Sequence, residues 1–335
     1  MKTSLTSLDD EVKKKLQRKS MPEWTSPMLA TLTDEHFSSA DWLYERKLDG
    51  ERCLAFSDGR GVRLLSRNRK KLNDTYPELV EALEAAGPER FIADGEVVAF
   101  DGKVTSFSRL QQRIGITDVD AARASGVAVY LYLFDLIYLG QYALDDLPLR
   151  DRKRTLRRAF DFNDPIRFTP HRNRDGIDFY TQACERGWEG IIAKKAEGPY
   201  VHSRSRDWLK FKCVNRQELV IGGFTEPGGA RQGFGALLLG YYEGDDLVYA
   251  GKVGTGFDDA TLKRLHDTMA DIEQDESPFA EAVNEKNTHW LKPELVAEIG
   301  FTEWTSDGKL RHPRYIGLRQ DKPARKVHRE RPKHV

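Results

Sequence analysis

The pattern of apolar residues changes near residue 214, and this change limits what the chain can fold into. Before it, short apolar runs with strand character are interleaved with segments of helical periodicity. The strand-like runs are 42–48, 52–56, 62–66, 91–100 and 129–139, and the helical segments are 77–87 and 175–187. Their irregular alternation predicts an α+β unit of antiparallel sheets with packed helices.

From about residue 216 the pattern becomes that of a small β-barrel with one intervening helix, which predicts an OB-fold. The strand-like runs are 218–229, 234–254 and 295–319, and the helical segment is 258–274. The expected organisation is an N-terminal extension at 1–20, a first domain at 21–215, the OB-fold domain at 216–322 and a solvated basic tail at 323–335.

Length and charge set wider limits. A chain of 335 residues can form two domains, each with its own core. Acidic and basic residues balance at 53 each, so only local clusters of charge can argue for a polyanionic partner. Three cysteines, Cys53, Cys184 and Cys213, lie far apart without a metal-ligand spacing, which predicts reduced thiols in a cytosolic protein.

The first twenty residues are too charged to contain the apolar core of a signal peptide, and no later run is long enough to span a bilayer. We therefore expect a soluble protein of the cytoplasm that has no membrane contact.

A polar turn, "KLDGER", interrupts an apolar region at 47–52. Lys47 and Asp49 are compatible with a surface ion pair, which usually contributes little stability. They are also compatible with a nucleophilic amine, because Gly50 would let a phosphate-bearing ligand approach the backbone. A nucleophilic Lys47 needs nearby cations that lower its pKa.

Downstream, "DWLKFKC" supplies such cations. Lys210 and Lys212 lie on one face if the segment is a strand, with Phe211 directed into a core on the other. The pair suits a phosphate and would lower the pKa of a third lysine. A solvated edge strand would carry the same pattern.

Two carboxylates complete the set of groups that phosphoryl or nucleotidyl transfer requires. Glu96 and Glu189 each begin an apolar run, and a hard divalent cation prefers oxygen ligands. Taken singly, either residue could equally be a solvated glutamate at a strand entrance.

Together these motifs resemble the series of the covalent nucleotidyltransferases: ATP-dependent DNA ligases, RNA ligases and mRNA capping enzymes. The matching segments, in order and spacing, are "KLDGER", "SRN", "ADGEVV", "LFDLIYL", "EGIIAKK", "WLKFK" and "GLRQDK". Residues 302–324 are similar to the C-terminal portion of the ligase module of bacterial DNA ligase D, the non-homologous end-joining enzyme. The resemblance covers about residues 21–326, and the complete series is far more specific than one KxDGxR match.

The resemblance implies that Lys47 attacks the α-phosphate of ATP, expels pyrophosphate and becomes lysyl-AMP. An ordinary lysine has a pKa of roughly 10.4, so only about one amine in a thousand is neutral near pH 7.4. Lys210 and Lys212, with a bound metal, are implied to hold Lys47 neutral. Glu189 is implied to bind Mg²⁺ or Mn²⁺, and Glu96 to contact the ribose or the metal.

The remaining implied contacts serve the nucleotide and the DNA end. Glu45 would meet the adenine amino group, Phe134 would stack on the ring, Lys194 would add positive charge, and Arg52 and Arg67 would contact the ribose or the DNA ends. In the OB-fold domain, Arg319, Asp321 and Lys322 are implied to orient the pyrophosphate after closure about a hinge near 214–218.

The implied substrate is nicked or broken duplex DNA with a 3′-hydroxyl and a 5′-phosphate, held through phosphates and therefore sensitive to salt. Larger ligases carry an N-terminal DNA-binding domain, whereas about twenty residues precede the module here. We expect weak unaided DNA binding, recruitment by a repair protein such as Ku, and a monomer that acts at the bacterial nucleoid. The alternatives are an RNA ligase, a GTP-dependent capping-type enzyme, and an inactive OB-fold protein that binds nucleic acid.

Overall fold

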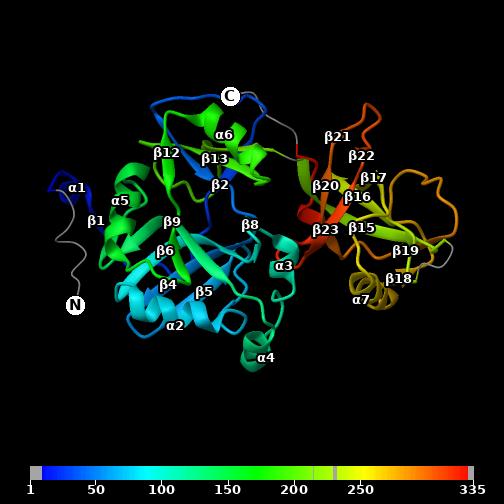
Figure 1. Ribbon diagram of the computed structural model, residues 1–335, viewed down its shortest axis with the longest axis horizontal. Helices are drawn as coiled ribbons and strands as arrows, with labels where there is room; N and C mark the ends of the chain where they lie inside the picture. Colours follow the sequence, from blue (N-terminus) through cyan, green and yellow to red (C-terminus); the bar gives the residue numbers. More distant parts are fainter. Residues whose placement is uncertain (1–9, 214, 229–231, 331–335) are drawn as a thin grey trace. The chain divides into compact units, whose positions relative to one another are not determined.

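The computed structural model describes residues 10–213, 215–228 and 232–330. They form two compact units that divide after Cys213 (Figure 1). Each unit contains its own buried apolar core. The predicted α+β class, with mostly antiparallel sheets and packed helices, is confirmed.

The first unit contains a seven-stranded sheet in the order β1-β10-β9-β6-β4-β5, with β11 beside β9. Its strands are β1 (Gln17–Arg18), β10 (Tyr142–Ala143), β9 (Tyr130–Leu139), β6 (Arg90–Val98), β4 (Glu51–Asp58), β5 (Val62–Ser66) and β11 (Ile166–Phe168). All pairs are antiparallel except β11 with β9. β7 (Phe100–Asp101) and β8 (Val104–Thr105) form a separate hairpin.

A second, five-stranded sheet of this unit has the order β12-β3-β13-β14-β2. Its strands are β12 (His171–Asn173), β3 (Trp42–Arg46), β13 (Gly190–Lys195), β14 (Arg204–Lys212) and β2 (Leu29–Leu32). β2 runs parallel to β14, and the other pairs are antiparallel. The motifs around residues 45, 190 and 210 are therefore neighbours in one sheet, although they are far apart in sequence.

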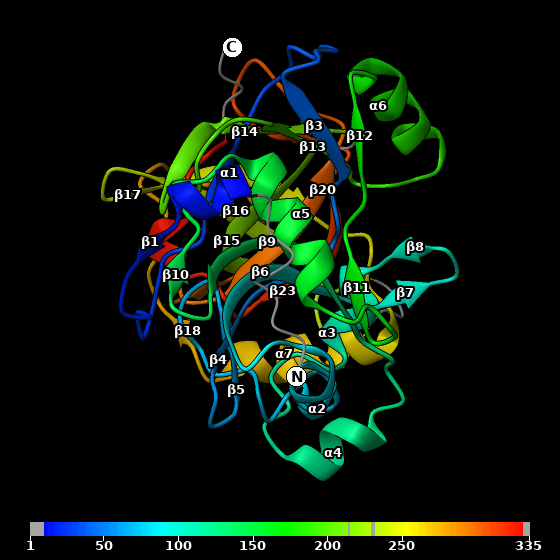
Figure 2. The same cartoon turned by 90° about the vertical axis from the view of Figure 1, so that its left-hand side faces the viewer.

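The described part of this unit also contains helices, several of which pack against its two sheets (Figure 2). They are α1 (Asp10–Lys15), α2 (Pro77–Ala86), α3 (Phe107–Gln111), α4 (Val119–Ala124), α5 (Leu149–Ala159) and α6 (Gly176–Glu185). α5 packs on β9 and α6 on β13. None of the described helices has the length and apolar character that a membrane crossing requires.

Local signals explain the predicted helices. α2 begins at Pro77, whose fixed φ and missing N–H suit the first helical turn, and Gly87 caps its end. Leu79 and Leu83, four residues apart, are buried under it. α5 was not predicted, because its charged sequence hides the apolar spacing of its buried residues.

The second unit is built on one seven-stranded sheet with the main order β17-β16-β15-β19-β18, in which β20 pairs with β15 and β23. Its strands are β15 (Asn215–Thr225), β16 (Leu237–Glu243), β17 (Asp246–Val253), β18 (Glu273–Gln274), β19 (Thr288–Leu291), β20 (Val296–Phe301) and β23 (Arg314–Arg319). A hairpin of β21 (Glu303–Trp304) and β22 (Leu310–Arg311), helix α7 (Asp259–Ala270) and the 3₁₀ helix η1 (Ala324–Lys326) complete it. The predicted helix at 258–274 corresponds to α7, whose first turn is capped by the Asp258 carboxylate.

The prediction of a solvated tail from residue 323 is wrong at Ala324 and Val327, whereas Arg325, Lys326 and His328 are exposed. Val327 is fully buried in the core of the second unit. Its carbonyl accepts a hydrogen bond from the Tyr242 amide at 2.7 Å, and Tyr242 O lies 2.8 Å from Nδ1 of His328. The basic composition of this segment concealed two apolar residues, Ala324 and Val327, that belong to the core.

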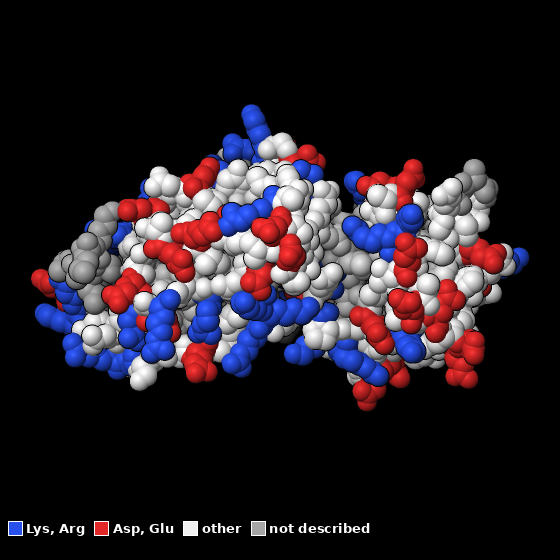
Figure 3. All heavy atoms as spheres, turned by 90° about the horizontal axis from the view of Figure 1, so that it is seen from below, with Lys and Arg blue, Asp and Glu red and all other residues white. Residues whose placement is uncertain are grey.

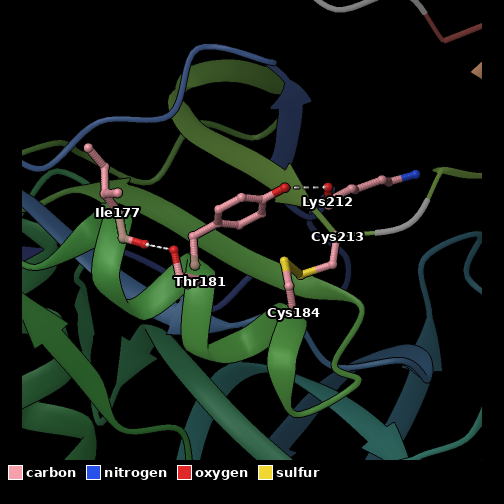
Figure 4. The surroundings of a disulfide bond; sticks show 6 residues. Ile177, Thr181, Cys184, Lys212 and Cys213 are labelled. Carbon is pink, nitrogen blue, oxygen red and sulfur yellow. Dashed lines mark hydrogen bonds between the residues drawn. A yellow bond between two sulfur atoms is a disulfide. The ribbon is translucent and has the colours of Figure 1, made fainter.

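The prediction of three reduced cysteines is also wrong. Cys184 and Cys213 form a disulfide (Figure 4). Cys53 is a buried free thiol. The paired cysteines' separation of 29 residues in the sequence does not indicate a disulfide. The two cysteines meet because α6 packs beside the end of β14.

Candidate active site

The pleat of the five-stranded sheet sorts its side chains onto two faces. Tyr44, Ile191, Ala193, Leu209 and Phe211 point to one face and form an apolar core with α6. The alternate residues point to the other face, which is the candidate site. They are Glu45, Lys47, Ile192, Lys194, Trp208, Lys210, Lys212 and His171. The predicted burial of Phe211 opposite the two lysines is confirmed.

Lys47 follows β3 and meets the end of β13. Its backbone N–H donates to the Gly190 carbonyl at 2.9 Å, and its ammonium forms an ion pair with the Glu189 carboxylate. Gly190 is opposite Lys212 in the neighbouring strand. Lys47 and Lys212 therefore lie on either side of Gly190, where the backbone of β14 takes the place that a side chain would fill.

The charges around Lys47 differ from the prediction. Burial lowers the pKa of Lys47, but the negative charge of Glu189, with smaller effects of Asp49 and Glu96, outweighs burial and raises that pKa above its usual value. The amine is therefore protonated in this structure and is not held neutral by Lys210 and Lys212. The sequence predicted the basic pair Lys210 and Lys212, but not that the Glu189 carboxylate forms an ion pair with the Lys47 amine.

A second group of charged residues is buried beside Phe134. Glu45 forms ion pairs with Lys153 and, at 2.6 Å, with Lys194, and all three side chains are at most 2% exposed. Lys194 Nζ lies 4.2 Å from the centroid of the Phe134 ring and 3.9 Å from that of Trp208. Burial lowers the pKa of Lys194 to about 8 although Glu45 acts to raise it.

Lys153 is a site residue that the sequence analysis missed. Its ammonium also donates to the Thr169 carbonyl at 3.0 Å, so three elements converge on one buried cation. The available signal was the spacing of Leu149, Lys153 and Leu156, which puts a lysine on the apolar face of a helix. A lysine buried in this way requires an acidic partner.

Arg52 is tied to a carboxylate that was not predicted. Its Nε and Nη2 donate to the two oxygens of Asp94 at 2.5 and 2.6 Å, and Tyr200 Oη donates to Asp94 at 2.5 Å. The guanidinium carbon of Arg52 lies 4.8 Å from the centroid of Phe134. This bidentate pair fixes the plane of the guanidinium, so Arg52 is held beside the ring rather than mobile.

The other predicted residues of this unit lie nearby. Glu96 is opposite Arg52 in the β4–β6 pair. Arg67 follows Ser66, which is opposite Cys53, so the "SRN" turn lies beside the Arg52 strand. Phe134 is 8% exposed and is part of a small core with Trp208.

His171 adds a polar atom to the same face. It is opposite Glu45 in the sheet, and its Nδ1 is buried without a hydrogen-bond partner among the described residues. Burial, followed by the charge of Lys153, lowers the pKa of His171, so the ring is neutral at pH 7. A buried polar atom of this kind is available to a ligand.

Carboxylates suited to a divalent cation are present. Glu189, Asp49 and Glu96 all act on Lys47 electrostatically. Mg²⁺ is commonly held by one or two carboxylates together with substrate phosphates, so Glu189 and Glu96 fit the ion when a nucleotide completes the set. Within the described residues, no three acidic, histidine or cysteine side chains form a ready-made metal cluster.

The last predicted motif lies in the second unit. Arg319 forms ion pairs with Glu298 at 3.0 Å and with Asp321 at 2.8 Å, and Lys322 pairs with Glu218 at 3.1 Å. These carboxylates raise the pKa of Arg319 well above its usual range, against the effect of burial. The expected contact of Arg319 and Lys322 with pyrophosphate remains a prediction.

Comparison with protein families matches both units. Residues 27–212 match the model described as "ATP dependent DNA ligase domain", and residues 230–322 match "ATP dependent DNA ligase C terminal region". The second match agrees with the predicted OB-fold.

Individual relatives match over most of the chain. The multifunctional non-homologous end joining protein LigD of Pseudomonas aeruginosa is 38% identical over 321 residues, which is 93% of this chain and 37% of that protein. The corresponding DNA repair protein of Mycobacterium tuberculosis is 36% identical over 315 residues, 91% of this chain and 40% of that protein. The chain thus spans about two fifths of the length of these curated relatives.

A solved structure has the same fold. A mycobacterial DNA ligase D complexed with ATP and MES superimposes with a TM-score of 0.67 at 34% identity, covering 91% of this chain and 98% of the other.

Proposed function

Because this chain belongs to the family of ATP-dependent DNA ligases, we propose that it joins a 3′-hydroxyl to a 5′-phosphate in duplex DNA, with ATP as co-substrate. The observation that carries the proposal is the seat of Lys47. Its amine pairs with Glu189, the residue before β13, on the sheet face that also carries Glu45, Lys194, Lys210 and Lys212. A nucleophile, a basic pair and a base-binding group therefore share one surface.

In the first step, Lys47 Nζ attacks the α-phosphorus of ATP. A phosphoramidate bond forms, the bond to the β-phosphate oxygen breaks, and pyrophosphate leaves. The AMP then passes to the 5′-phosphate of a break, and the 3′-hydroxyl displaces it to restore the backbone. Positioning and charge neutralisation account for most of this chemistry.

Lys47 must lose a proton before it attacks. Glu189 keeps the amine protonated in the structure. We propose that Glu189 and Glu96 hold Mg²⁺ or Mn²⁺, which would supply positive charge that offsets the nucleotide phosphates. With Glu189 held by such a cation, Lys47 would lack its ion-pair partner, and Lys210 and Lys212 would favour the neutral amine.

The buried charges suit adenine. The Glu45 carboxylate can accept from the amino group at position 6, and the Lys194 ammonium can donate to ring nitrogen N1. The rings of Phe134 and Trp208 provide the apolar wall against which a base packs. Guanine presents a carbonyl oxygen and an N–H at these positions, so it would face the wrong partners.

Contacts with DNA are expected mainly at phosphates. Arg52 lies on β4 and Arg67 in the turn that follows the neighbouring β5, and both would contact the ribose or the DNA ends. On the face drawn in Figure 3, basic side chains gather along the lower edge of the first unit, among interspersed acidic ones. We expect weak DNA binding that falls steeply with salt, and closure of the second unit to bring Arg319, Asp321 and Lys322 to the pyrophosphate.

The biological setting is proposed from the named relatives. Two are described as non-homologous end joining proteins, so we propose a role in repair of DNA breaks in the bacterial cytoplasm. Recruitment by Ku, or by another repair protein, would compensate for weak DNA binding.

The test is covalent labelling with α-³²P-ATP and Mg²⁺ or Mn²⁺. We expect the chain to retain label, Lys47→Ala to retain none, and Lys195→Ala to match the parent. Lys195 is a suitable control because it is a lysine of the same sheet that pairs at the surface with Asp207. Label on the Lys47→Ala protein would remove the assigned nucleophile. Sealing of nicked DNA, with nicked RNA as comparison, tests the substrate.

A further inference from the structure

The Cys184–Cys213 disulfide joins two elements of the first unit at the point where that unit ends. Cys184 belongs to α6, and Cys213 directly follows β14, with 5.2 Å between their Cα atoms. Figure 4 shows the bond between the helix and the strand end. The chain leaves the first unit immediately after this bond.

The same strand end is linked to the candidate active site through the backbone. The Cys213 N–H donates to the Glu189 carbonyl at 3.0 Å, and Tyr180 Oη of α6 donates to the Lys212 carbonyl at 3.1 Å (Figure 4). Glu189 and Lys212 are proposed site residues, and Lys47 bonds to Gly190, the next residue. The disulfide therefore restrains the backbone that carries both side chains.

The two disulfide-bonded cysteines differ from the third cysteine in exposure. Cys184 and Cys213 are partly exposed, and Cys53 is fully buried. Burial raises the pKa of the Cys53 thiol well above its usual value, which makes that thiol unreactive. The Cys184–Cys213 disulfide is therefore the candidate for thiol–disulfide exchange, and the buried Cys53 thiol serves as an internal control.

We propose that Cys184 and Cys213 form a thiol–disulfide exchange site through which cellular dithiols lower the rate of Lys47 adenylation. The effect on rate rests on the proposed function, whereas the exchange itself does not. A dithiol thiolate attacks one sulfur, forms a mixed disulfide and releases the other cysteine as a thiolate. The second thiol of the reductant then attacks its own mixed-disulfide sulfur and releases the remaining cysteine. The protein gains two electrons and two protons, and the dithiol becomes a disulfide.

The direction of the effect follows from the restraint. After reduction, the end of β14 keeps its hydrogen bonds to Tyr180 and Glu189 but loses its covalent tie to α6. Lys212 and Glu189 then occupy a wider range of positions around the α-phosphate. Because small displacements of positioning groups slow a reaction strongly, adenylation should slow at least about threefold.

The first test counts thiols in the native protein purified in air. Iodoacetamide followed by peptide mass spectrometry should find no alkylation of Cys184 or Cys213 before dithiothreitol and alkylation of both after it. Cys53 should remain unmodified until the protein is unfolded. Alkylation of Cys184 and Cys213 without reductant, or resistance of the pair to dithiothreitol, would overturn the proposal.

The second test measures lysyl-AMP formation in one sample that is oxidised, reduced with dithiothreitol and reoxidised with oxidised dithiothreitol. The parent should slow and recover, while Cys184→Ser and Cys213→Ser should stay slow throughout. Equal rates in all states would overturn the regulatory role. Because one parent sample passes through all states, a folding defect in a variant cannot produce the reversible change. Absence of lysyl-AMP in every state would instead remove the ligase proposal, and the thiol count would still decide the exchange site.

Discussion

Buried ion pairs set the protonation states of the charged side chains in the candidate site. Lys47 is paired with Glu189, and Glu45 accepts from both Lys153 and Lys194. In each case burial alone would favour the neutral form of the side chain. A partner of opposite charge reverses that effect on the pKa of Lys47 and Glu45 and reduces it for Lys194. The protein therefore holds Lys47, the proposed nucleophile, protonated and Glu45, the proposed base-binding residue, ionised.

The variant Lys153→Met tests whether Lys153 positions the Glu45 carboxylate. Loss of the charged partner should loosen Glu45 and raise the KM for ATP by roughly tenfold, since a hydrogen bond to a charged group contributes about 1.5–3 kcal/mol. The pKa of Lys194 should rise above about 8, because Lys153 lowers it by like-charge repulsion. The measurement is the adenylation rate against ATP concentration and pH.

The matched control is Arg154→Met, which removes a neighbouring cation whose side chain is 44% exposed and pairs with Asp151. It should leave both the KM and the pH profile unchanged. An unaltered KM for ATP in the Lys153→Met protein would contradict the positioning role of Lys153.

Among the elements, the meeting of β3, β13 and β14 sets the geometry of the site. Gly190 has φ +146°, and a Cβ at this position would lie 2.0 Å from the Phe211 carbonyl oxygen. Only a residue without a side chain allows β14 to approach so closely. The same close approach brings the backbone of Lys212 beside Gly190.

The variant Gly190→Ala should therefore destabilise the first unit by about 3 kcal/mol or more, because the strand pair must separate. Gly187→Ala is the control, because Gly187 has φ +69° and no atom of the described residues lies within 4 Å of the place that a Cβ would occupy. It should cost only about 1–2 kcal/mol, the ordinary penalty of a left-handed conformation. Denaturant unfolding followed by fluorescence measures both, and equal losses would refute the steric explanation.

On the scale of the whole molecule, each unit completes its own core. The core of the second unit includes Val327, which lies beyond the last strand and the "GLRQDK" motif. Residues that look like a charged tail in the sequence therefore contribute to the stability of that unit.

Val327→Ala should lower the free energy of unfolding of the second unit by about 1.5 kcal/mol, since two buried methylene equivalents contribute about 0.8 kcal/mol each. Arg325→Ala is the control, because that side chain is 68% exposed, and its effect should stay within about 0.5 kcal/mol. Urea unfolding measures both variants. Equal stability of Val327→Ala and the parent would show that the segment is not part of the core.

Much of the organisation was predictable from local patterns. The strands around 45, 95 and 135, the helices at 77–87 and 258–274, and the burial of Phe211 follow from periodicity, which depends on the backbone geometry of each element alone. The ordered motifs also identified Lys47, Glu189 and the basic pair as companions. Those inferences needed no knowledge of how distant strands pair.

The sequence by itself therefore determined the class of fold, the motif series and the side chains that share a strand face. Tertiary structure alone decided which charges meet: Glu189 with Lys47, Lys153 with Glu45, and Asp94 with Arg52. It also decided that Cys184 meets Cys213. The physical reason is that periodicity reports one element at a time, whereas a contact across many residues depends on strand register and helix packing. Burial then strengthens these contacts, because a desolvated charge must find a partner.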